Sequence, residues 1–361
     1  SNLEVGTKEN RQEYLNLLFT MWGNKAVSEL YEPGSTFKLI TTSVALERGA
    51  ANLHSTFTCS GSLKIEGYYR AISCHKRKGH GALTFAEALQ QSCNPSMMTM
   101  AMRIGREDFY NYFKKFGYTG KSGIDLPSEA KGYYHTYDDF SNVSLAVYSF
   151  GQTFKTTAIQ QLRAISAVAN GGYLVTPHLL HSIVDNDGNI IYEYKDDSKQ
   201  QIMDSQICAT ISQILKEGVD GEGGAKNAYV AGYSIAAKTG TSEKKDKYDA
   251  SGNTSYRVSS CIAYAPSEDA QVAVIILVDE PTVGSKYGSV VVAVDGVGVP
   301  GGWGPAGPKE GWDLIPMWIA DMNFPVVPTI QQAMIRRASE PTFGYFNPRE
   351  EYFSKIIKWS T

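Results

Sequence analysis

The sequence lacks a long apolar run and an excess of positive charge. No stretch reaches the roughly 18 consecutive apolar residues that a transmembrane helix needs, so we expect no membrane span within it. Its 34 lysines and arginines face 37 aspartates and glutamates, which gives a formal net charge of −3. Nucleic-acid-binding proteins usually present a basic patch or stripe, and this composition offers none. We therefore expect no nucleic-acid partner.

Cysteine is also scarce. The five cysteines are too few for a disulfide scaffold, and no two of them form a C-x-x-C pair. No signal peptide is present and the chain opens with Ser1 rather than methionine, so we expect a fragment of a longer protein. Its 361 residues are enough for one large domain or two ordinary ones.

Helix signals dominate the first part of the chain and strand signals come late. Residues 34–48 predict a buried helix, because the segment is apolar on nearly every side and Gly49 follows as a C-terminal cap. Further helices are expected at 84–93, 96–104, 108–116, 157–170 and 204–217. Strands are expected at 234–239, 257–264 and 271–279, with a polar loop at 242–254. This order favours an α+β fold with an antiparallel sheet flanked by helices.

Ser35 and Lys38 are the first residues that suggest chemistry. Residues at i and i+3 share a helix face, so the hydroxyl and the amine can touch. A serine is a weak nucleophile until a base takes its proton, and burial can lower a lysine pKa enough for that task. The pattern S-x-x-K occurs four times, the others starting at Ser73, Ser128 and Ser242. Only Ser35 begins a buried helix, whose N–H groups favour a developing oxyanion.

A second short motif comprises Ser92 and Asn94. It lies where a predicted helix ends before Pro95, so its side chains project from a helix–loop corner. At that corner Ser92 can relay a proton and Asn94 can hold a substrate amide. A similar match at Ser251 and Asn253 falls in the polar loop, and we interpret it as a turn.

A third motif, Lys238, Thr239 and Gly240, stands at the end of a predicted strand and is followed by Thr241. An edge strand can pair with an extended peptide, and glycine permits close approach. Lys238 supplies positive charge for a substrate carboxylate, while the two threonines add hydroxyl donors. The similar run at 121–123 lies between predicted helices, and we interpret it as incidental.

These motifs, in this order, resemble those of a known family. The segments YEPGSTFK (31–38), EALQQSCNP (87–95), AAKTGTSEK (236–244) and VIILVDEP (274–281) are similar to the transpeptidase domain of class B penicillin-binding proteins. The resemblance covers roughly residues 20–290. It implies the fold shared with serine β-lactamases, built on a five-stranded antiparallel sheet. It also implies cross-linking of peptidoglycan stem peptides that end in D-Ala-D-Ala, covalent inhibition by β-lactams, and neither a cofactor nor a metal at the site.

The resemblance assigns a role to each residue of the three motifs. Ser35 would be the nucleophile and Lys38 its base, and Ser92 and Asn94 would form the second motif. Lys238 and Thr239 would bind the substrate carboxylate. The N–H groups of Ser35 and Thr241 would form the oxyanion hole. The parent protein would be anchored at the extracytoplasmic face of the bacterial cytoplasmic membrane. A cell-wall synthesis complex would be a partner of that parent protein.

The chain departs from this family at both ends. The first strands of the domain are not found in residues 1–30, and a Gly/Pro-rich linker at 291–311 replaces the last helix. The prediction is therefore an N-terminally truncated domain at 1–290. Residues 312–361 resemble the N-terminal segment of a pyridoxal-phosphate C–S lyase of the cystathionine β-lyase type. They end before that family's cofactor-binding lysine, so we expect no cofactor there.

Other functions compete with a transpeptidase. One alternative is a sensor or inactive module that is acylated by β-lactams without turnover. Another is a β-lactamase, which needs a base for deacylation. Glu129 is the only nearby acid in a loop suited to such a base, and we favour interpreting it instead as a surface residue of the PSEAKG turn.

Cys59 and Cys74 flank a strand-like excursion and are expected to lie near each other. A disulfide between them is one interpretation if the domain faces an oxidising compartment. Zinc held by Cys59, Cys74, His75 and His80 is a second, although the spacing fits no standard finger. Two free thiols are the third. Cys93 is expected to be a core residue beside the site.

Overall fold

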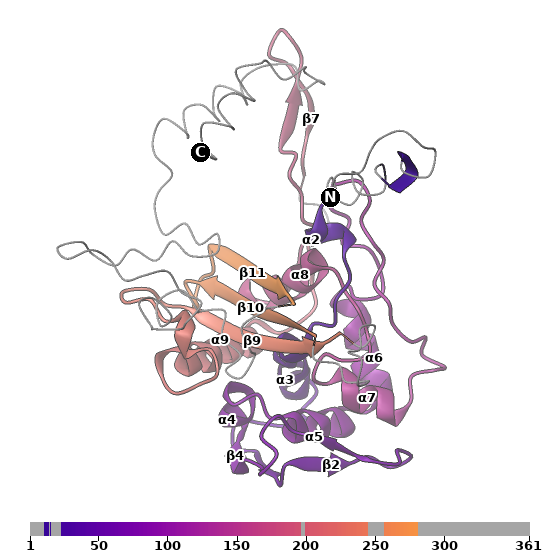
Figure 1. Ribbon diagram of the computed structural model, residues 1–361. Coiled ribbons are helices and arrows are strands. Elements are labelled where there is room, and N and C mark those ends of the chain that lie inside the picture. The colour runs from indigo at the N-terminus through magenta and orange to yellow at the C-terminus, as the bar shows by residue number, and fades with distance from the viewer. Residues whose placement is uncertain (1–10, 14, 16–22, 196–198, 245–255, 281–361) are drawn as a thin grey trace, which may run out of the picture. The chain divides into compact units, whose positions relative to one another are not determined.

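The computed structural model describes residues 11–13, 15, 23–195, 199–244 and 256–280, all within one compact unit. An antiparallel sheet flanked by helices confirms the predicted α+β class (Figure 1). The predictions for the first strands fall mostly outside these residues. Those for the last helix, the 291–311 linker and the 312–361 segment fall entirely outside them.

The sheet has the order β11-β10-β9 among the described residues. These strands are β9 (Ala236–Glu243), β10 (Arg257–Ala265) and β11 (Val272–Asp279). All three lie close to their predicted positions. β9 extends further than expected, into the predicted polar loop, because its end stays paired with β10 through Ser242 and Val258. β9 is thus an outer strand of the described sheet.

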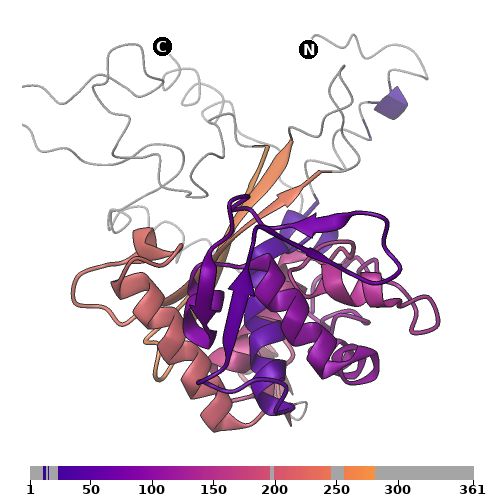
Figure 2. The same cartoon turned by 90° about the horizontal axis from the view of Figure 1, so that it is seen from below.

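Helices cover the sheet and continue into a second, mainly helical part (Figures 1 and 2). α8 (Ala158–Ala169) packs against β11, and α9 (Ser205–Asp220) packs against β9. The 3₁₀ turn η1 (Gly34–Phe37) leads directly into α3 (Lys38–Glu47). Residues 38–45 of α3 are all buried, which confirms the predicted central helix. Its start is wrong in detail, since the segment that holds Ser35 is 3₁₀ rather than α-helical.

The second part brings short elements together around α5. It contains α4 (Phe85–Gln90), α5 (Asn94–Ile104), α6 (Arg106–Lys115) and α7 (Asn142–Tyr148), with β1 (Thr56–Cys59) paired to β4 (Gly81–Thr84) and β2 (Ser62–Lys64) paired to β3 (Ala71–Ser73). α5 packs on α3, so the start of α5 comes close to Lys38. The predicted capping box of Thr84 and Glu87 is present at the start of α4.

The remaining elements lie away from this junction. They are α2 (Lys25–Ser28), the pair β5 (Tyr173–Leu174) and β8 (Gln200–Gln201), the pair β6 (Ser182–Val184) and β7 (Ile190–Glu193), and the turn η2 (Lys226–Ala228). None of them, nor α7, was predicted from the sequence. Each is short, and the β5–β8 pair joins strands that are distant in sequence. No helix in the described ranges has the length and apolar character needed to cross a bilayer.

Candidate active site

Ser35 lies in η1, which packs against the edge strand β9. In a 3₁₀ turn the side chains at i and i+3 eclipse, so Ser35 and Lys38 project in the same direction. Ser35 is half-buried, whereas its neighbours Thr36 and Phe37 are buried. The turn therefore presents a single partly accessible hydroxyl at the junction between the sheet and the helical part.

Lys38 is fully buried and reaches across this junction to the second motif. Its Nζ donates to the Ser92 carbonyl oxygen at 2.6 Å, to Asn94 Oδ1 at 2.6 Å and to Ser92 Oγ at 2.9 Å. No hydrogen bond joins it to Ser35 within the described part of the chain. The expected contact between the two is therefore not formed in the structure. Catalytic hydrogen bonds commonly tighten only when substrate binds.

The backbone at Ser92 explains how its side chain is aimed. Its φ is +55°, in the left-handed region that non-glycine residues rarely occupy. The N–H of Ser92 bonds to the Leu89 carbonyl, and the N–H of Cys93 bonds to the Ala88 carbonyl. These two bonds form the Schellman motif that ends α4, with Ser92 in the position where glycine is usual. A serine held there indicates a role for its side chain.

Lys238 approaches the same hydroxyl from β9. It is 2 % exposed, and its Nζ donates to Ser92 Oγ at 3.1 Å and to the Thr239 carbonyl at 2.8 Å. Ser92 Oγ therefore lies between the amines of Lys38 and Lys238. The structure brings these predicted residues together from three separate parts of the chain.

Burial shifts both lysines toward the neutral amine. Loss of hydration lowers the pKa of Lys38 well below its usual value, and the nearby charge of Lys238 lowers it further. Burial likewise lowers the pKa of Lys238 to about 8. The charge of Lys238 thus disfavours protonation of Lys38, which is the arrangement that a neutral Lys38 beside a protonated Lys238 requires.

The rest of the third motif follows β9. A Cβ at Gly240 would lie only 2.6 Å from Ser260 Oγ and 3.2 Å from the Pro33 carbonyl oxygen, so only glycine lets η1 approach this strand. Thr239 Oγ1 donates to the Gly224 carbonyl at 3.2 Å. Thr241 pairs with Ser259 in the sheet. The predicted carboxylate and oxyanion roles of Thr239 and Thr241 remain predictions.

Asn94 has a structural partner that the sequence did not indicate. Its Nδ2 donates to the Ser73 carbonyl oxygen at 3.1 Å, at the end of β3. The amide thus links Lys38 to the β2–β3 hairpin. No local signal in the sequence identifies this contact, because it depends on how the hairpin packs against α5.

Glu129 is not a surface residue, so that interpretation is wrong. It is 8 % exposed, and its carboxylate accepts hydrogen bonds from the backbone N–H groups of Ser122 and Gly123. Burial is favourable because these donors replace water around the charge. The carboxylate is hydrogen-bonded to the backbone of this loop, so the structure does not support a role for Glu129 as a deacylating base.

The fold and the order of the three motifs are those of a penicillin-binding transpeptidase domain, and the comparisons give the same family. The chain belongs to the penicillin-binding protein transpeptidase family, whose domain description, "Penicillin binding protein transpeptidase domain", matches residues 3–294. This range starts earlier than the expected limit near residue 20.

Several named proteins are similar over most of this domain. The chain is 36 % identical over 273 residues to stage V sporulation protein D of Bacillus subtilis, covering 75 % of this chain and 41 % of that one. It is 30 % identical over 275 residues to the probable peptidoglycan D,D-transpeptidase PbpC of Pseudomonas aeruginosa, covering 75 % and 45 %. The chain thus spans less than half the length of these relatives.

Solved structures give the same fold. Penicillin binding protein 3 from Mycobacterium tuberculosis superimposes with a TM-score of 0.66 at 26 % identity, covering 72 % of this chain and 59 % of that one. The same protein has been solved in complex with aztreonam and with ampicillin.

Proposed function

We propose that this chain carries the catalytic domain of a peptidoglycan D,D-transpeptidase. The observation that best supports this function is the placement of Ser92 Oγ between two buried lysines, 2.9 Å from Lys38 Nζ and 3.1 Å from Lys238 Nζ. An acyl-transfer site needs a base for the nucleophile and a path for the proton to the leaving group. The hydrogen bonds among Lys38, Ser92 and Lys238 supply both.

The contacts of Lys38 fit a neutral amine. Two of its three partners, the Ser92 carbonyl and Asn94 Oδ1, can only accept hydrogen bonds, and they take both N–H groups of a neutral amine. The third, Ser92 Oγ, accepts from the protonated form but donates its own proton to the lone pair of the neutral form. That lone pair is the basic site. Lys38 can therefore take the proton of Ser35 as Ser35 Oγ attacks the carbonyl of the penultimate D-Ala.

The proton then has to reach the leaving group. As the peptide C–N bond breaks, the terminal D-Ala leaves as an amine and receives the proton through Ser92. The acyl group remains on Ser35 until an amine of another stem peptide attacks it and restores the serine. Protonated Lys238 and Thr239 hold the substrate carboxylate, and the N–H groups of Ser35 and Thr241 stabilise the oxyanion.

β-lactams would acylate Ser35 in the same way, since their carbonyl occupies the position of the D-Ala carbonyl. The penicillin binding protein 3 complexes with aztreonam and ampicillin support this extension. We further propose that the domain works at the extracytoplasmic face of the bacterial membrane, within an anchored and longer parent protein and a cell-wall synthesis complex. Relatives named for sporulation and for D,D-transpeptidation are consistent with this setting.

Residues 1–290 would provide all of this chemistry without a cofactor. The 291–311 segment would act as a linker, and the 312–361 segment would add no active group. Deletion of residues 300–361 should leave Ser35 acylation unchanged.

The test is turnover of a donor peptide that ends in D-Ala-D-Ala together with an amine acceptor. We expect release of D-Ala and formation of the exchanged peptide, and loss of both in Lys38→Ala. Acylation by penicillin without any exchanged peptide would contradict the proposal and indicate a sensor. Rapid nitrocefin hydrolysis would contradict it in favour of a β-lactamase.

A further inference from the structure

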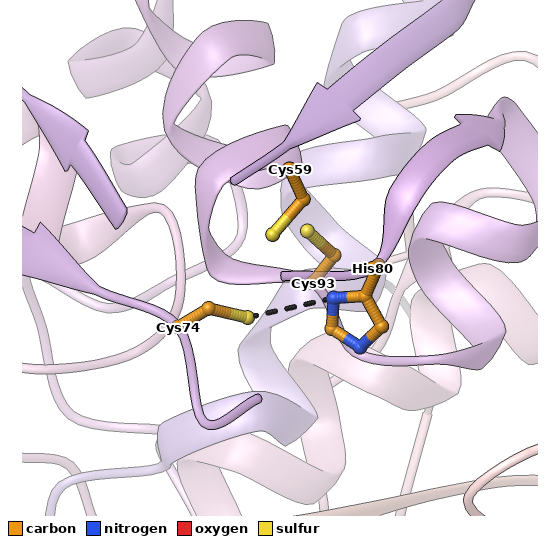
Figure 3. A group of neighbouring side chains, drawn as sticks. All are labelled: Cys59, Cys74, His80 and Cys93. Atoms are coloured by element: carbon orange, nitrogen blue, oxygen red, sulfur yellow. Dashed lines mark hydrogen bonds between the residues drawn. The ribbon is translucent and has the colours of Figure 1, made fainter. Parts of the chain in front are cut away.

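Four side chains from separate segments converge beside the active site: Cys59, Cys74, His80 and Cys93 (Figure 3). Each offers one ligand atom, and these atoms all lie within 4.8 Å of one another. The three cysteines are buried. Every cysteine is a free thiol in the structure, so the disulfide interpretation for Cys59 and Cys74 is not the arrangement found.

The backbone holds this group closely. Cys59 ends β1, Cys74 follows β3, His80 precedes β4, and Cys93 stands at the corner before α5. Gly79 has a φ of +82°, and a Cβ there would overlap the Cys59 carbonyl oxygen. Only glycine lets the chain pass that close and place His80 opposite the sulfurs.

We propose that Cys59, Cys74, His80 and Cys93 bind one Zn²⁺ ion in a tetrahedral Cys₃His site. Thiolate and imidazole are the ligands that zinc prefers in structural sites. With Zn–S near 2.3 Å and Zn–N near 2.0–2.1 Å, a tetrahedral site has S···N edges of about 3.6 Å. The distance from Cys74 Sγ to His80 Nδ1 is 3.6 Å, so little movement is needed to admit the ion.

The ligand set differs from the sequence-based alternative in one member. That alternative used His75, whose Nδ1 lies 3.7 Å from Cys74 Sγ and whose ring packs edge-on to that of His80. The group of mutually close ligand atoms excludes His75 and includes Cys93. Cys93 is buried in the core, as expected, and the proposal adds a ligand role to it.

Hydrogen-bond donors surround the sulfurs, as a metal-thiolate site requires. The His75 imidazole and the backbone N–H groups of Lys76 and Asn94 lie against Cys74 Sγ. Cys93 is the N-cap residue of the 11-residue helix α5, whose N-terminus favours negative charge. The buried Ser96 side chain and its backbone N–H, in the same turn, lie against Cys93 and can donate to a Cys93 thiolate.

The ion has a structural role because four protein ligands leave no position open for substrate or water. Cys93 stands between Ser92 and Asn94, the two residues that hold Lys38 Nζ. A metal bond to Cys93 joins this corner to β1, to the segment after β3 and to the segment before β4. The site thereby fixes the serine and the amide that position the base.

The test is the zinc content of the full chain purified without chelator, measured by elemental analysis beside single variants. We expect one zinc per chain, retained in His75→Ala and Cys208→Ser and lost in His80→Ala and Cys74→Ser. His75 is the neighbouring imidazole outside the group, and Cys208 is a buried cysteine on α9, so both serve as matched controls.

Cobalt substitution covers the case in which a ligand variant folds poorly. The metal-depleted wild-type chain given Co²⁺ should develop a sulfur-to-cobalt charge-transfer band and the intense visible bands of tetrahedral cobalt. Three results would overturn the proposal: no metal bound with all five thiols titratable, a disulfide within the group, or metal loss in Cys208→Ser equal to that in Cys74→Ser.

Discussion

Variants of Ser92 can separate the free-energy cost of its left-handed backbone conformation from the catalytic role of its hydroxyl. An L-residue in the left-handed region costs roughly 1–2 kcal/mol that glycine does not incur. Ser92→Ala and Ser92→Gly both lose the hydroxyl between Lys38 and Lys238, so the loss of those hydrogen bonds cancels in their comparison. Part of the stabilisation that glycine brings at this φ is offset by the greater conformational freedom of glycine in the unfolded chain. Ser92→Gly should therefore be more stable than Ser92→Ala by about 1 kcal/mol, or roughly 2–4 °C in Tm.

Both variants should lose about 10²- to 10⁴-fold in the rate of acylation by a fluorescent penicillin, the usual range for a lost proton-transfer group. Ser128 has a φ of +64° in a loop and provides the control. Ser128→Gly and Ser128→Ala should show the same order of stability with unchanged acylation. A Ser92→Gly variant less stable than Ser92→Ala would refute the backbone argument, and near-normal acylation in either would refute the relay.

Three further predictions concern charged residues, two of them at the site and one in a supporting loop. Acylation needs neutral Lys38 and protonated Lys238, so its rate should fall at low pH as Lys38 gains a proton and fall again above about pH 8 as Lys238 loses one. Because arginine stays protonated, Lys238→Arg should move this alkaline limb to higher pH, as a pH–rate profile will show. Lys38→Ala should slow acylation more than Lys238→Ala in stopped-flow labelling, since it removes the base; equal losses would argue against these roles. Glu129→Gln should lower the unfolding free energy in urea by about 1–2 kcal/mol, because its bonds to the Ser122 and Gly123 N–H groups lose their charge, while the acylation rate stays unchanged.

The long elements could be predicted because their signals are local. The apolar composition of 34–48 and the capping box at Thr84 gave helices near their observed positions, and the apolar runs of β10 and β11 gave strands. The short strands β5 to β8 and helix α7 were missed. β5 and β8 pair across a long segment, so no short sequence window contains their signal. β6 and β7 form a hairpin around Asp187 and Gly188, a local turn signal that was overlooked.

The residues of the site could be listed from the sequence, but their contacts could not. Spacing on a helix placed Lys38 beside Ser35, whereas the structure directs its amine to Ser92 and Asn94. That direction depends on the Schellman turn at Ser92 and on the packing of α5 against α3. The packing of β1 and β3 against α5 brings Cys59 and Cys74 to Cys93, which the irregular spacing along the chain did not reveal.

The central claim is that Ser35 is the acylated nucleophile, and covalent labelling tests it most directly. The full chain is incubated with a fluorescent penicillin, the adduct is counted by intact mass, and its position is mapped by peptide sequencing. We predict one adduct on Ser35, absent in Ser35→Ala and retained in Ser73→Ala, Ser128→Ala and Ser242→Ala, the other serines of the S-x-x-K pattern. An adduct that persists in Ser35→Ala, or that maps to another residue in the wild-type chain, would contradict the account.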